Sequence, residues 1–258
     1  METLQTIAGL AATQLKNAMS LQLRKEMEKQ KEIILKDLTK SNQELNDFAH
    51  VVSHDLKSPL RSMNALVSWL KEDCADFSND DINANLDSLL KKIDRMDLLI
   101  NGILSYASID RVKKKSQPID LNELVRDILD TIHTPQNIEI QIKTKLPIVK
   151  GDSFKMIQLF QNLLSNAIKY SDKEKGVVII NCISEKNYWQ FSIRDNGMGI
   201  SEKYFDKIFQ VFQVLEKSED STGVGLSIVQ KIIAFYNGKI WLESKLEKGT
   251  TFFFTLPK

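Results

Sequence analysis

Apolar side chains recur at helical spacing along the first part of the chain. Residues 15–70 contain no glycine, and Pro59 is their only proline. Apolar or small positions follow one another in steps of 4-3-4-4-3-4-3-4, and charged residues fill the other faces. This is a heptad repeat with one stutter, which at this length and without caps indicates a coiled coil rather than a single amphipathic helix on a globular core. The positions are Leu23, Met27, Gln30, Ile34, Leu38, Ser41, Leu45, Phe48 and Val52.

A second helix is predicted for residues 82–109, after the polar segment 73–81 interrupts the pattern. Two long helices joined by a short loop form an antiparallel hairpin. One hairpin cannot cover its own apolar stripe, but two hairpins related by a two-fold axis form a four-helix bundle, so we expect a homodimer. The stripe of the second helix is Leu86, Leu89, Ile93, Met96, Ile100, Ile103 and Ala107.

The pattern changes after residues 111–118, RVKKKSQP, which are basic and polar, end in proline and are typical of a linker. We predict helices near 122–133, 152–170 and 223–236, the second of them capped by Asp152. Alternating or apolar segments predict strands at 138–142, 177–183, 189–194, 239–244 and 250–256. This half of the chain is expected to be an α/β domain whose helices cover a sheet.

The composition excludes several classes of protein. Apolar residues make up 42% of the chain, and 35 basic residues nearly balance 34 acidic ones, which gives no reason to expect nucleic acid or an acidic membrane as the partner. Cys74 and Cys182 show no metal-ligand spacing and are interpreted as reduced thiols of a cytoplasmic protein. No apolar run approaches the roughly 18 residues of a membrane span, and no signal peptide is visible.

His54 is the first candidate functional residue. On a helix it lies about 160–200° from an apolar stripe, at about 100° per residue, and the stripe is Leu45, Phe48, Val52, Leu56, Met63 and Leu70. An imidazole held in solvent on a rigid helix, beside the carboxylate of Asp55, can be neutral and nucleophilic near pH 7. His50 lies one turn earlier on nearly the same face and is the direct alternative, although no acid follows it.

Five further motifs follow in a fixed order: QNLLSNAIKY (161–170), DNGMGI (195–200), YFDKIFQVF (204–212), STGVGLSIV (221–229) and GTTF (249–252). Behind SHDLKSPL (53–60), they resemble the motifs of two-component sensor histidine kinases over about residues 44–258. The resemblance implies a multidomain α and α+β protein. A coiled coil leads into an antiparallel helical hairpin that dimerises as a four-helix bundle, and an α/β sandwich of the GHKL type then binds ATP.

The resemblance also implies three domains. Residues 1–43 are a signalling helix or coiled coil, 44–112 the dimerisation and phosphotransfer hairpin, and 113–258 the ATP-binding catalytic domain. Residues 1–20 resemble the last helix of a GAF sensory domain, which implies an upstream sensory domain as a partner.

On the hairpin, the family pattern makes His54 the phospho-acceptor and Asp55 its general base or hydrogen-bond partner. Adjacent helical residues do not face each other, so Asp55 must reach the ring through its rotamer or a bend, which Pro59 could supply. Ser58 lies one turn after His54, where the family often has Thr or Asn associated with dephosphorylation of the partner protein. Serine departs from that pattern, and a helix-surface serine before proline, without a role in dephosphorylation, is an equally good interpretation.

Three side chains of the first sandwich motif share a helix face: Asn162, Asn166 and Lys169. Two asparagines within one turn are unusual because asparagine is a poor helix former, and amide oxygens are hard ligands that suit Mg²⁺. The resemblance implies that Asn166 and Asn162 serve Mg²⁺ and ATP, with Lys169 and Tyr170 near the phosphates and ribose. Taken alone, the motif would be a solvated helix face.

Asp195 follows an alternating strand, and its carboxylate can only accept hydrogen bonds, which fits the exocyclic amine of adenine. Taken alone, it would be a common Asp-Asn-Gly turn. Backbone N–H groups where the second glycine motif opens a helix form a phosphate site, and no G-x-x-x-x-G-K-[ST] sequence is present. The family usually has a glycine where Ser221 stands. The remaining residues implied for ATP binding are Gly197, Gly199, Phe209, Phe212, Gly223, Val224, Gly225, Leu226 and Thr250.

The resulting prediction is a cytoplasmic histidine kinase that autophosphorylates on His54 and passes the phosphoryl group to an aspartate of a response-regulator receiver domain. The first alternative is a degenerate, non-catalytic dimeric scaffold that binds a receiver domain. Degeneracy would be expected to remove His54, Asn166 or Asp195, and all three are present. The second is a GHKL ATPase without phosphotransfer, which would require a water-activating acid where Gln158 and Gln161 stand.

Overall fold

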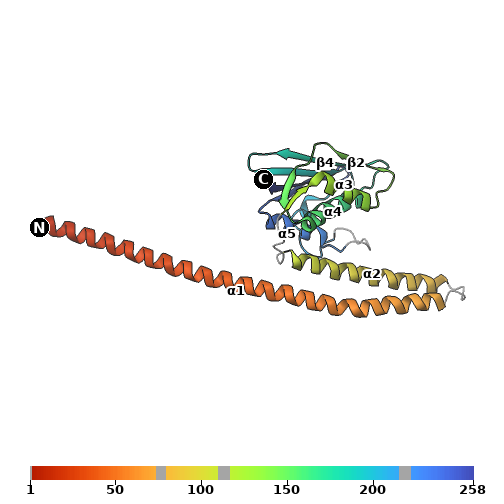
Figure 1. Ribbon diagram of the computed structural model, residues 1–258, viewed down its shortest axis with the longest axis horizontal. Coiled ribbons are helices and arrows are strands. Elements are labelled where there is room, and N and C mark those ends of the chain that lie inside the picture. The colour runs from red at the N-terminus through yellow and green to blue at the C-terminus, as the bar shows by residue number, and fades with distance from the viewer. Residues whose placement is uncertain (1, 74–79, 110–116, 215–221) are drawn as a thin grey trace. The chain divides into compact units, whose positions relative to one another are not determined.

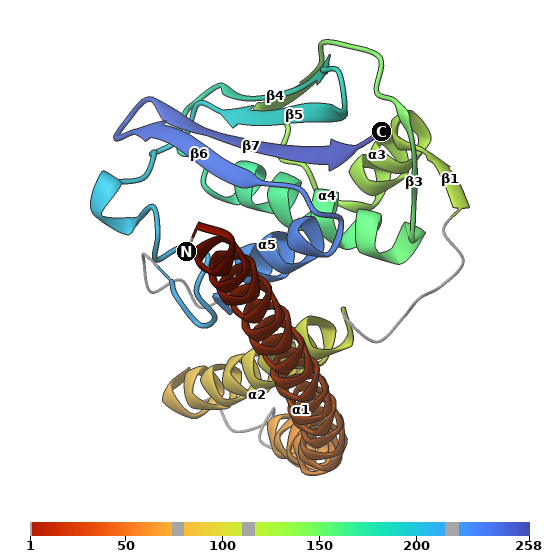
Figure 2. The same ribbon diagram turned by 90° about the vertical axis from the view of Figure 1, so that its left-hand side faces the viewer.

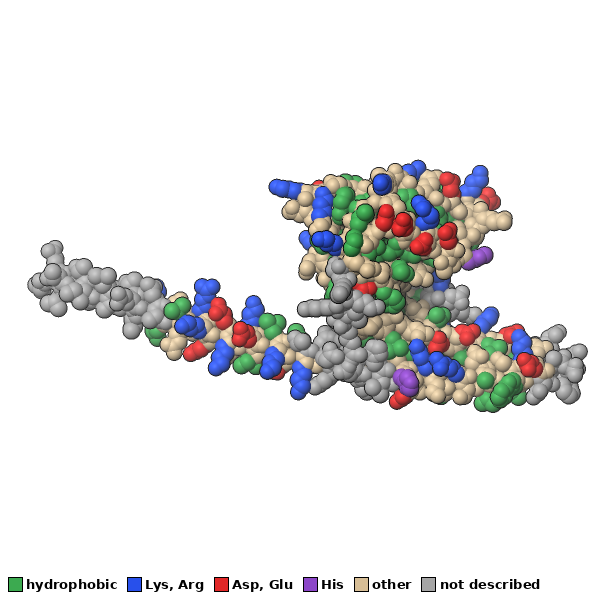
Figure 3. Space-filling view, in the orientation of Figure 1, with side chains coloured by type: hydrophobic (Ala, Val, Ile, Leu, Met, Phe, Trp, Pro, Cys, Tyr) green, Lys and Arg blue, Asp and Glu red, His purple; other side chains and the backbone are tan. Residues whose placement is uncertain are grey.

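Helix α1 spans Glu2–Asp73 without interruption (Figure 1). The computed structural model describes residues 2–73, 80–109, 117–214 and 222–258, and the contacts divide the chain into two units, Met1–Ala49 and His50–Lys258. The first unit consists of the N-terminal part of α1, so the predicted long helix is confirmed. Apolar, basic and acidic side chains alternate on its described surface (Figure 3). The described apolar residues of its heptad stripe are exposed, as expected for a helix without a partner in its own unit: Leu23, Met27, Ile34 and Leu38.

The C-terminal part of α1 and helix α2 (Asp80–Ser108) form the predicted hairpin. Its buried cluster consists of Leu60, Ile93 and Ile100, with Val67 and Leu104 packed against it. An ion pair joins the two helices between Lys71 Nζ and Asp87 Oδ1, 2.6 Å apart, although both side chains are about half exposed.

The apolar stripe of the hairpin divides into a covered and an uncovered face. On α2, Leu86, Ile93 and Ile100 are buried. The alternate positions are exposed, as are their counterparts on α1: Leu89, Met96, Leu56, Met63 and Leu70. The hairpin therefore buries only one side of its stripe, which is the arrangement that the sequence pattern predicts for half of a four-helix bundle.

The remainder of the second unit is an α/β sandwich (Figure 2). The five-stranded sheet has the order β2-β4-β5-β7-β6, with β2 parallel to β4 and the other neighbours antiparallel. A separate antiparallel pair joins β1 and β3. The three helices of the sandwich lie against one face of the sheet (Figure 2). In chain order the elements are β1 Gln117–Asp120, α3 Leu121–Thr131, β2 Ile138–Ile142, β3 Ile148–Gly151, α4 Ser153–Lys169, β4 Gly176–Ser184, β5 Tyr188–Asp195, a short 3-10 turn at Glu202–Tyr204, α5 Gly225–Phe235, β6 Ile240–Lys245 and β7 Gly249–Pro257.

Three phenylalanines fix α4 on the sheet. The ring of Phe160 meets those of Phe191 and Phe254 edge-on, at centroid distances of 5.9 and 5.7 Å, and the two strand rings stack at 4.8 Å. All three are fully buried, and such ring pairs add roughly 0.5–1.5 kcal/mol each beyond the area they bury. Helix α4 therefore has a rigid position in the sandwich.

The predicted cap of α4 is confirmed, since Asp152 Oδ1 accepts hydrogen bonds from the N–H groups of Phe154 and Lys155. Strands β1 and β3 were not predicted, because four residues each give too short a pattern to identify a strand. Helix α5 begins at Gly225, two residues later than predicted. In the part of the chain that the structure describes, no helix combines the length and apolar character needed to cross a membrane.

Candidate nucleotide-binding and phospho-acceptor sites

His54 projects from α1 with 87% of its side chain exposed, as predicted. Its Nδ1 lies 3.2 Å from Oδ1 of Asp55, so the two side chains meet although adjacent positions diverge by about 100° on a helix. If Nδ1 carries the proton, it donates this bond and Nε2 keeps a free lone pair. Ser58 is exposed one turn further on. The side chain of His50 lies outside the described residues.

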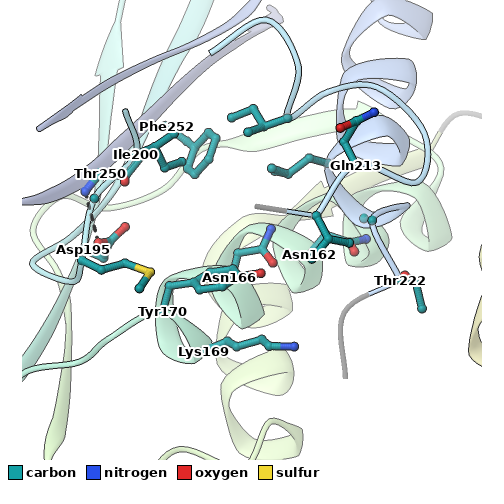
Figure 4. A pocket seen from close by; sticks show the side chains of 17 residues that line it. Asn162, Asn166, Lys169, Tyr170, Asp195, Ile200, Gln213, Thr222, Thr250 and Phe252 are labelled. Atoms are coloured by element: carbon teal, nitrogen blue, oxygen red, sulfur yellow. Dashed lines mark hydrogen bonds between the residues drawn. The ribbon is translucent and has the colours of Figure 1, made fainter. Parts of the chain in front are cut away.

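A cavity of about 190 Å³ opens between α4, the end of β5, the loop before α5 and β7 (Figure 4). One end is formed by Asp195 and Thr250, the other by Asn162, Gln213 and Thr222 (Figure 4). The cavity therefore brings together residues from all five sequence motifs of the sandwich. Its walls are Asn162, Asn166, Lys169, Tyr170, Asp195, Met198, Gly199, Ile200, Ile208, Gln213, Val214, Thr222, Gly223, Gly225, Leu226, Thr250 and Phe252.

Asp195 is buried at one end of this cavity. Its Oδ1 accepts two backbone hydrogen bonds, from Gly197 N–H at 2.9 Å and Thr250 N–H at 3.1 Å. Burial raises the pKa of the Asp195 carboxyl, and these two bonds oppose the rise. Both backbone bonds engage Oδ1, which leaves Oδ2 available to accept a hydrogen bond from a ligand amine.

The turn that follows Asp195 is held by the side chain of Asn196. Asn196 Oδ1 accepts the N–H of Val177 at 2.8 Å, and its Nδ2 donates to the carbonyl of Lys175 at 3.0 Å. A side chain at Gly197 would collide with the backbone carbonyl of Tyr170. The turn therefore lies directly against the end of α4, and this position accepts only glycine without rearrangement.

At the other end, α4 meets the start of α5. The Nδ2 of Asn162 donates to the carbonyl of Gln158 at 2.7 Å, which turns Oδ1 toward Gly225. A Cβ built on Gly225 would lie 2.5 Å from that oxygen, so any side chain at this position would displace the Asn162 amide. The first N–H groups of α5 therefore open onto the same space as Asn162 and Asn166, and helix N-termini of this kind bind phosphate.

Two of the residues predicted to bind ATP, Gly223 and Phe212, meet at the loop before α5. Gly223 has φ +69° and lines the cavity. Phe212 has φ +66°, is about half exposed, and donates its N–H to the carbonyl of Gly223. Phe212 therefore pairs with the loop by its backbone. Residues 215–221, which include Ser221, lie outside the described residues.

Four of the predicted binding residues do not line the cavity: Gly197, Phe209, Phe212 and Val224. Phe209 packs edge-on against Phe252 at 6.5 Å and supports the wall from behind. Val224 is buried and lies close to Gly102 of α2. The other predicted sandwich residues do line the cavity. The lining residues that the sequence analysis did not single out are Met198, Ile200, Ile208, Gln213, Val214, Thr222 and Phe252.

Most of these missed residues lie inside or beside the motifs already recognised. Met198 and Ile200 alternate with glycines in DNGMGI, Ile208 precedes Phe209, and Phe252 ends GTTF. The motifs therefore located these lining residues to within a few positions. Distinguishing them from their neighbours requires knowing which way each side chain points.

Two family models match the chain. The His Kinase A (phospho-acceptor) domain matches residues 44–112. The Histidine kinase-, DNA gyrase B-, and HSP90-like ATPase matches residues 151–258. The first match contains the hairpin with His54, and the second contains the asparagines, Asp195 and the loop before α5.

The matches to curated relatives extend over both the hairpin and the ATPase domain. The chain is 39% identical over 227 residues to cyanobacterial phytochrome B of Nostoc sp. (strain PCC 7120 / SAG 25.82 / UTEX 2576), covering 85% of this chain and 30% of the phytochrome. It is 31% identical over 239 residues to the sensor protein kinase WalK of Staphylococcus haemolyticus (strain JCSC1435), covering 87% of this chain and 39% of WalK. The chain thus spans about a third of the length of these relatives.

Among solved structures, full-length ShkA in complex with AMPPNP has a similar fold, with a TM-score of 0.64 and 23% identity over 82% of this chain and 45% of ShkA. Fold and pocket together define a GHKL-type ATPase domain that follows a phospho-acceptor hairpin. The chain belongs to the family of two-component sensor histidine kinases.

Proposed function

We propose that the protein transfers the γ-phosphoryl group of ATP to His54 and then to an aspartate of a response-regulator receiver domain. The observation that carries this proposal is the pairing of an exposed, Asp55-oriented imidazole with a cavity that combines a buried carboxylate, two asparagines and a helix start. Family membership supports the same two-step reaction.

Adenine would bind at the Asp195 end of the cavity. Oδ2 of the ionised carboxylate accepts a hydrogen bond from the exocyclic amine, and guanine, which has an oxygen at that position, is disfavoured. Apolar side chains around it supply the flat contacts that a base requires: Met198, Ile200, Ile208 and Phe252. The AMPPNP bound to the structural neighbour ShkA supports an adenine nucleotide as the ligand.

The triphosphate would lie between α4 and the start of α5. Lys169 and the first N–H groups of α5 supply positive potential, and Tyr170 lies beside Lys169 on the same wall. Within the described residues, no group of three or more His, Cys, Asp or Glu side chains could hold a metal. Amide oxygens with phosphate oxygens and water are ligands suited to Mg²⁺, so Asn166 and Asn162 are assigned to it. Bound Mg²⁺ would neutralise charge on the phosphates.

His54 acts as the nucleophile. Asp55 holds the ring through Nδ1, so Nε2 is the nitrogen that attacks. The Nε2–P bond forms as the bond between the γ-phosphorus and the bridging oxygen breaks, and ADP leaves. Ser58 lies one turn away, where its hydroxyl could orient a water that hydrolyses a phosphorylated partner.

The active form would be a homodimer in the cytoplasm, where ATP is available. The uncovered stripe of the hairpin supplies an apolar face for a second copy. The heptad stripe of α1 would continue the pairing as a coiled coil and carry the state of a sensory domain to the hairpin.

The direct test is incubation with γ-labelled ATP and Mg²⁺, comparing the wild-type protein with His54→Ala and His50→Ala. We expect an acid-labile, base-stable label that disappears only in His54→Ala. Label retained in His54→Ala would refute the assignment of the phospho-acceptor. Nucleotide binding without any label in the wild-type protein would favour the non-catalytic scaffold instead.

A further inference from the structure

Ser244 of β6 contacts the Asp195 end of the cavity without lining it. Its Oγ accepts the backbone N–H of Ile200 at 2.7 Å. The same oxygen lies 3.0 Å from the carbonyl oxygen of Gly249 and 2.9 Å from Oγ1 of Thr250. Ile200 and Thr250 both line the cavity. One hydroxyl group therefore joins the loop after β5 to the first residues of β7.

The three contacts use the whole hydrogen-bonding capacity of the Ser244 hydroxyl, which is one proton and two lone pairs. The carbonyl of Gly249 can only accept, so the Ser244 proton belongs to that bond. If Ser244 donated to Thr250 instead, its oxygen and the Gly249 carbonyl would face each other at 3.0 Å without a proton between them. Thr250 is therefore the donor of the bond between the two hydroxyls, and its Oγ1 keeps only lone pairs for the cavity.

Thr250 and Asp195 together form one end of the cavity (Figure 4). Both are buried, and the Thr250 N–H donates to Asp195 Oδ1 at 3.1 Å. Oδ2 of the carboxylate remains as an acceptor for a ligand. These two side chains therefore offer a ligand two acceptors, Asp195 Oδ2 and Thr250 Oγ1, and no donor.

We propose that Ser244 is a positioning residue that holds Thr250 Oγ1 as an acceptor, so that this end of the cavity binds both hydrogens of a 6-amino purine, an inference that rests on the proposed function. Asp195 Oδ2 accepts one hydrogen of the exocyclic amine, and Thr250 Oγ1 accepts the other. A 6-oxo purine has an oxygen at this position, which would face two acceptors. Ser244 touches no part of the base and acts only through Thr250.

The turn between β6 and β7 keeps its place without the Ser244 hydroxyl. Glu247 donates its N–H to the carbonyl of Met198 at 2.7 Å. A Cβ on Gly199 would collide with the backbone carbonyl of Lys245, so the two segments also lie in close contact there. Removal of the Ser244 hydroxyl should therefore leave the cavity formed and change mainly the direction of the Thr250 proton.

The first test compares ATP with ITP, which carries an oxygen in place of the 6-amino group. Isothermal titration of the full chain, in the presence of Mg²⁺, gives the ratio of the two dissociation constants. In Ser244→Ala the preference for ATP should fall about tenfold, because the freed Thr250 hydroxyl can turn and donate to the 6-oxo group. Ser244→Thr keeps a hydroxyl and should retain the preference. Ser192→Ala, at a partly buried serine of the same sheet that does not line the cavity, is the matched control.

The second test asks whether Ser244 acts through Thr250. Thr250→Val removes the hydroxyl and nearly keeps the shape of the side chain. Ser244→Ala should lower the preference for ATP in the wild-type background and leave it unchanged in Thr250→Val, because the group that it positions is then missing. If circular dichroism shows that Ser244→Ala is unfolded, Ser244→Cys serves in the same comparison, because a thiol is only a weak donor.

Three results would overturn this inference alone. An unchanged preference for ATP in Ser244→Ala, at whatever affinity, would make the role of Ser244 purely structural. An equal fall of the preference with and without the Thr250 hydroxyl would show that Ser244 acts by another route. A wild-type protein that binds ATP and ITP equally would remove the two-acceptor reading of the base, while label on His54 would still support the proposed phosphotransfer. A wild-type protein that binds neither nucleotide would refute the nucleotide site of the proposed function, and this inference with it.

Discussion

At the scale of single residues, the nucleotide site depends on close contacts as much as on hydrogen bonds. Gly225 and Asn162 come from different helices and lie so close that a side chain at Gly225 would displace the Asn162 amide. Asp195 receives two backbone bonds on one oxygen and presents the other to the cavity. A substitution at Gly225 or at Asp195 therefore tests how each contact contributes to nucleotide binding.

Gly225→Ala should weaken ATP binding at least about tenfold, equivalent to about 1.4 kcal/mol. The new methyl group would displace the Asn162 amide, break its bond to the Gln158 carbonyl and move a side chain assigned to Mg²⁺ and ATP. Isothermal titration with ATP measures the effect, and Gln230→Ala, an exposed change on the same helix, is the control. An unchanged ATP affinity would show that the contact between Asn162 and Gly225 is not needed for ATP binding.

The buried carboxyl of Asp195 should make adenosine binding depend on pH. Its pKa is raised by burial, so the ionised form needed for the adenine contact is lost at a higher pH than for an ordinary Asp. Adenosine affinity should therefore fall as the pH decreases through this raised pKa. The effect on folding has the opposite sign: the raised pKa stabilises the folded state at low pH, and this contribution is lost as the pH rises through the pKa of the folded state. Titrations of adenosine between about pH 4 and pH 8 test this. Asp195→Asn should bind weakly and lack the transition, and Asp172→Asn should retain it.

At the scale of elements, helix α4 links the core of the sandwich to its site. Phe160 anchors one face of α4 between the rings of Phe191 and Phe254, and the other face carries the two asparagines. This anchoring fixes the site residues on α4. A change at the start of the helix should therefore affect nucleotide binding as well as stability.

Asp152→Ala removes the cap of α4 and should lower the free energy of unfolding by about 1 kcal/mol. Two N–H groups of the first turn would lose their acceptor. Chemical denaturation measures the change. Asp127→Ala, at an exposed interior position of α3, should have a much smaller effect, and equal losses in the two variants would contradict the capping argument.

The sequence predicted these elements well where a pattern extends over several turns. The long helix, the hairpin, the cap at Asp152 and the five strands of the main sheet followed from periodicity and capping residues. The four-residue strands β1 and β3 were too short to show alternation. Within the site, motif spacing identified the correct segments, but not that Phe209 stands behind Phe252 or that Phe212 contacts Gly223 by its backbone. Those details depend on side-chain direction, which tertiary contacts decide.

At the scale of the whole molecule, the uncovered face of the hairpin is the feature with the widest consequence. Met63→Glu places a carboxylate in the expected dimer interface and should weaken dimerisation about a hundredfold or more, because burying an unpaired charge costs several kcal/mol. Sedimentation velocity over a concentration series measures this. Ile148→Glu on the sandwich should remain dimeric, and a dimeric Met63→Glu protein would place the interface elsewhere.

The contact between His54 and Asp55 has a consequence for what happens after the ring is modified. A phosphoryl group brings nearly two negative charges to an imidazole whose other nitrogen lies 3.2 Å from a carboxylate oxygen. If Nε2 is the nitrogen that is phosphorylated, as proposed, the ring keeps its Nδ1 proton, and Asp55 would hold that proton in place by accepting its hydrogen bond. A ring that stays protonated leaves phosphorus as a neutral imidazole, so the acidic neighbour that orients the ring would also ease the departure of the phosphoryl group.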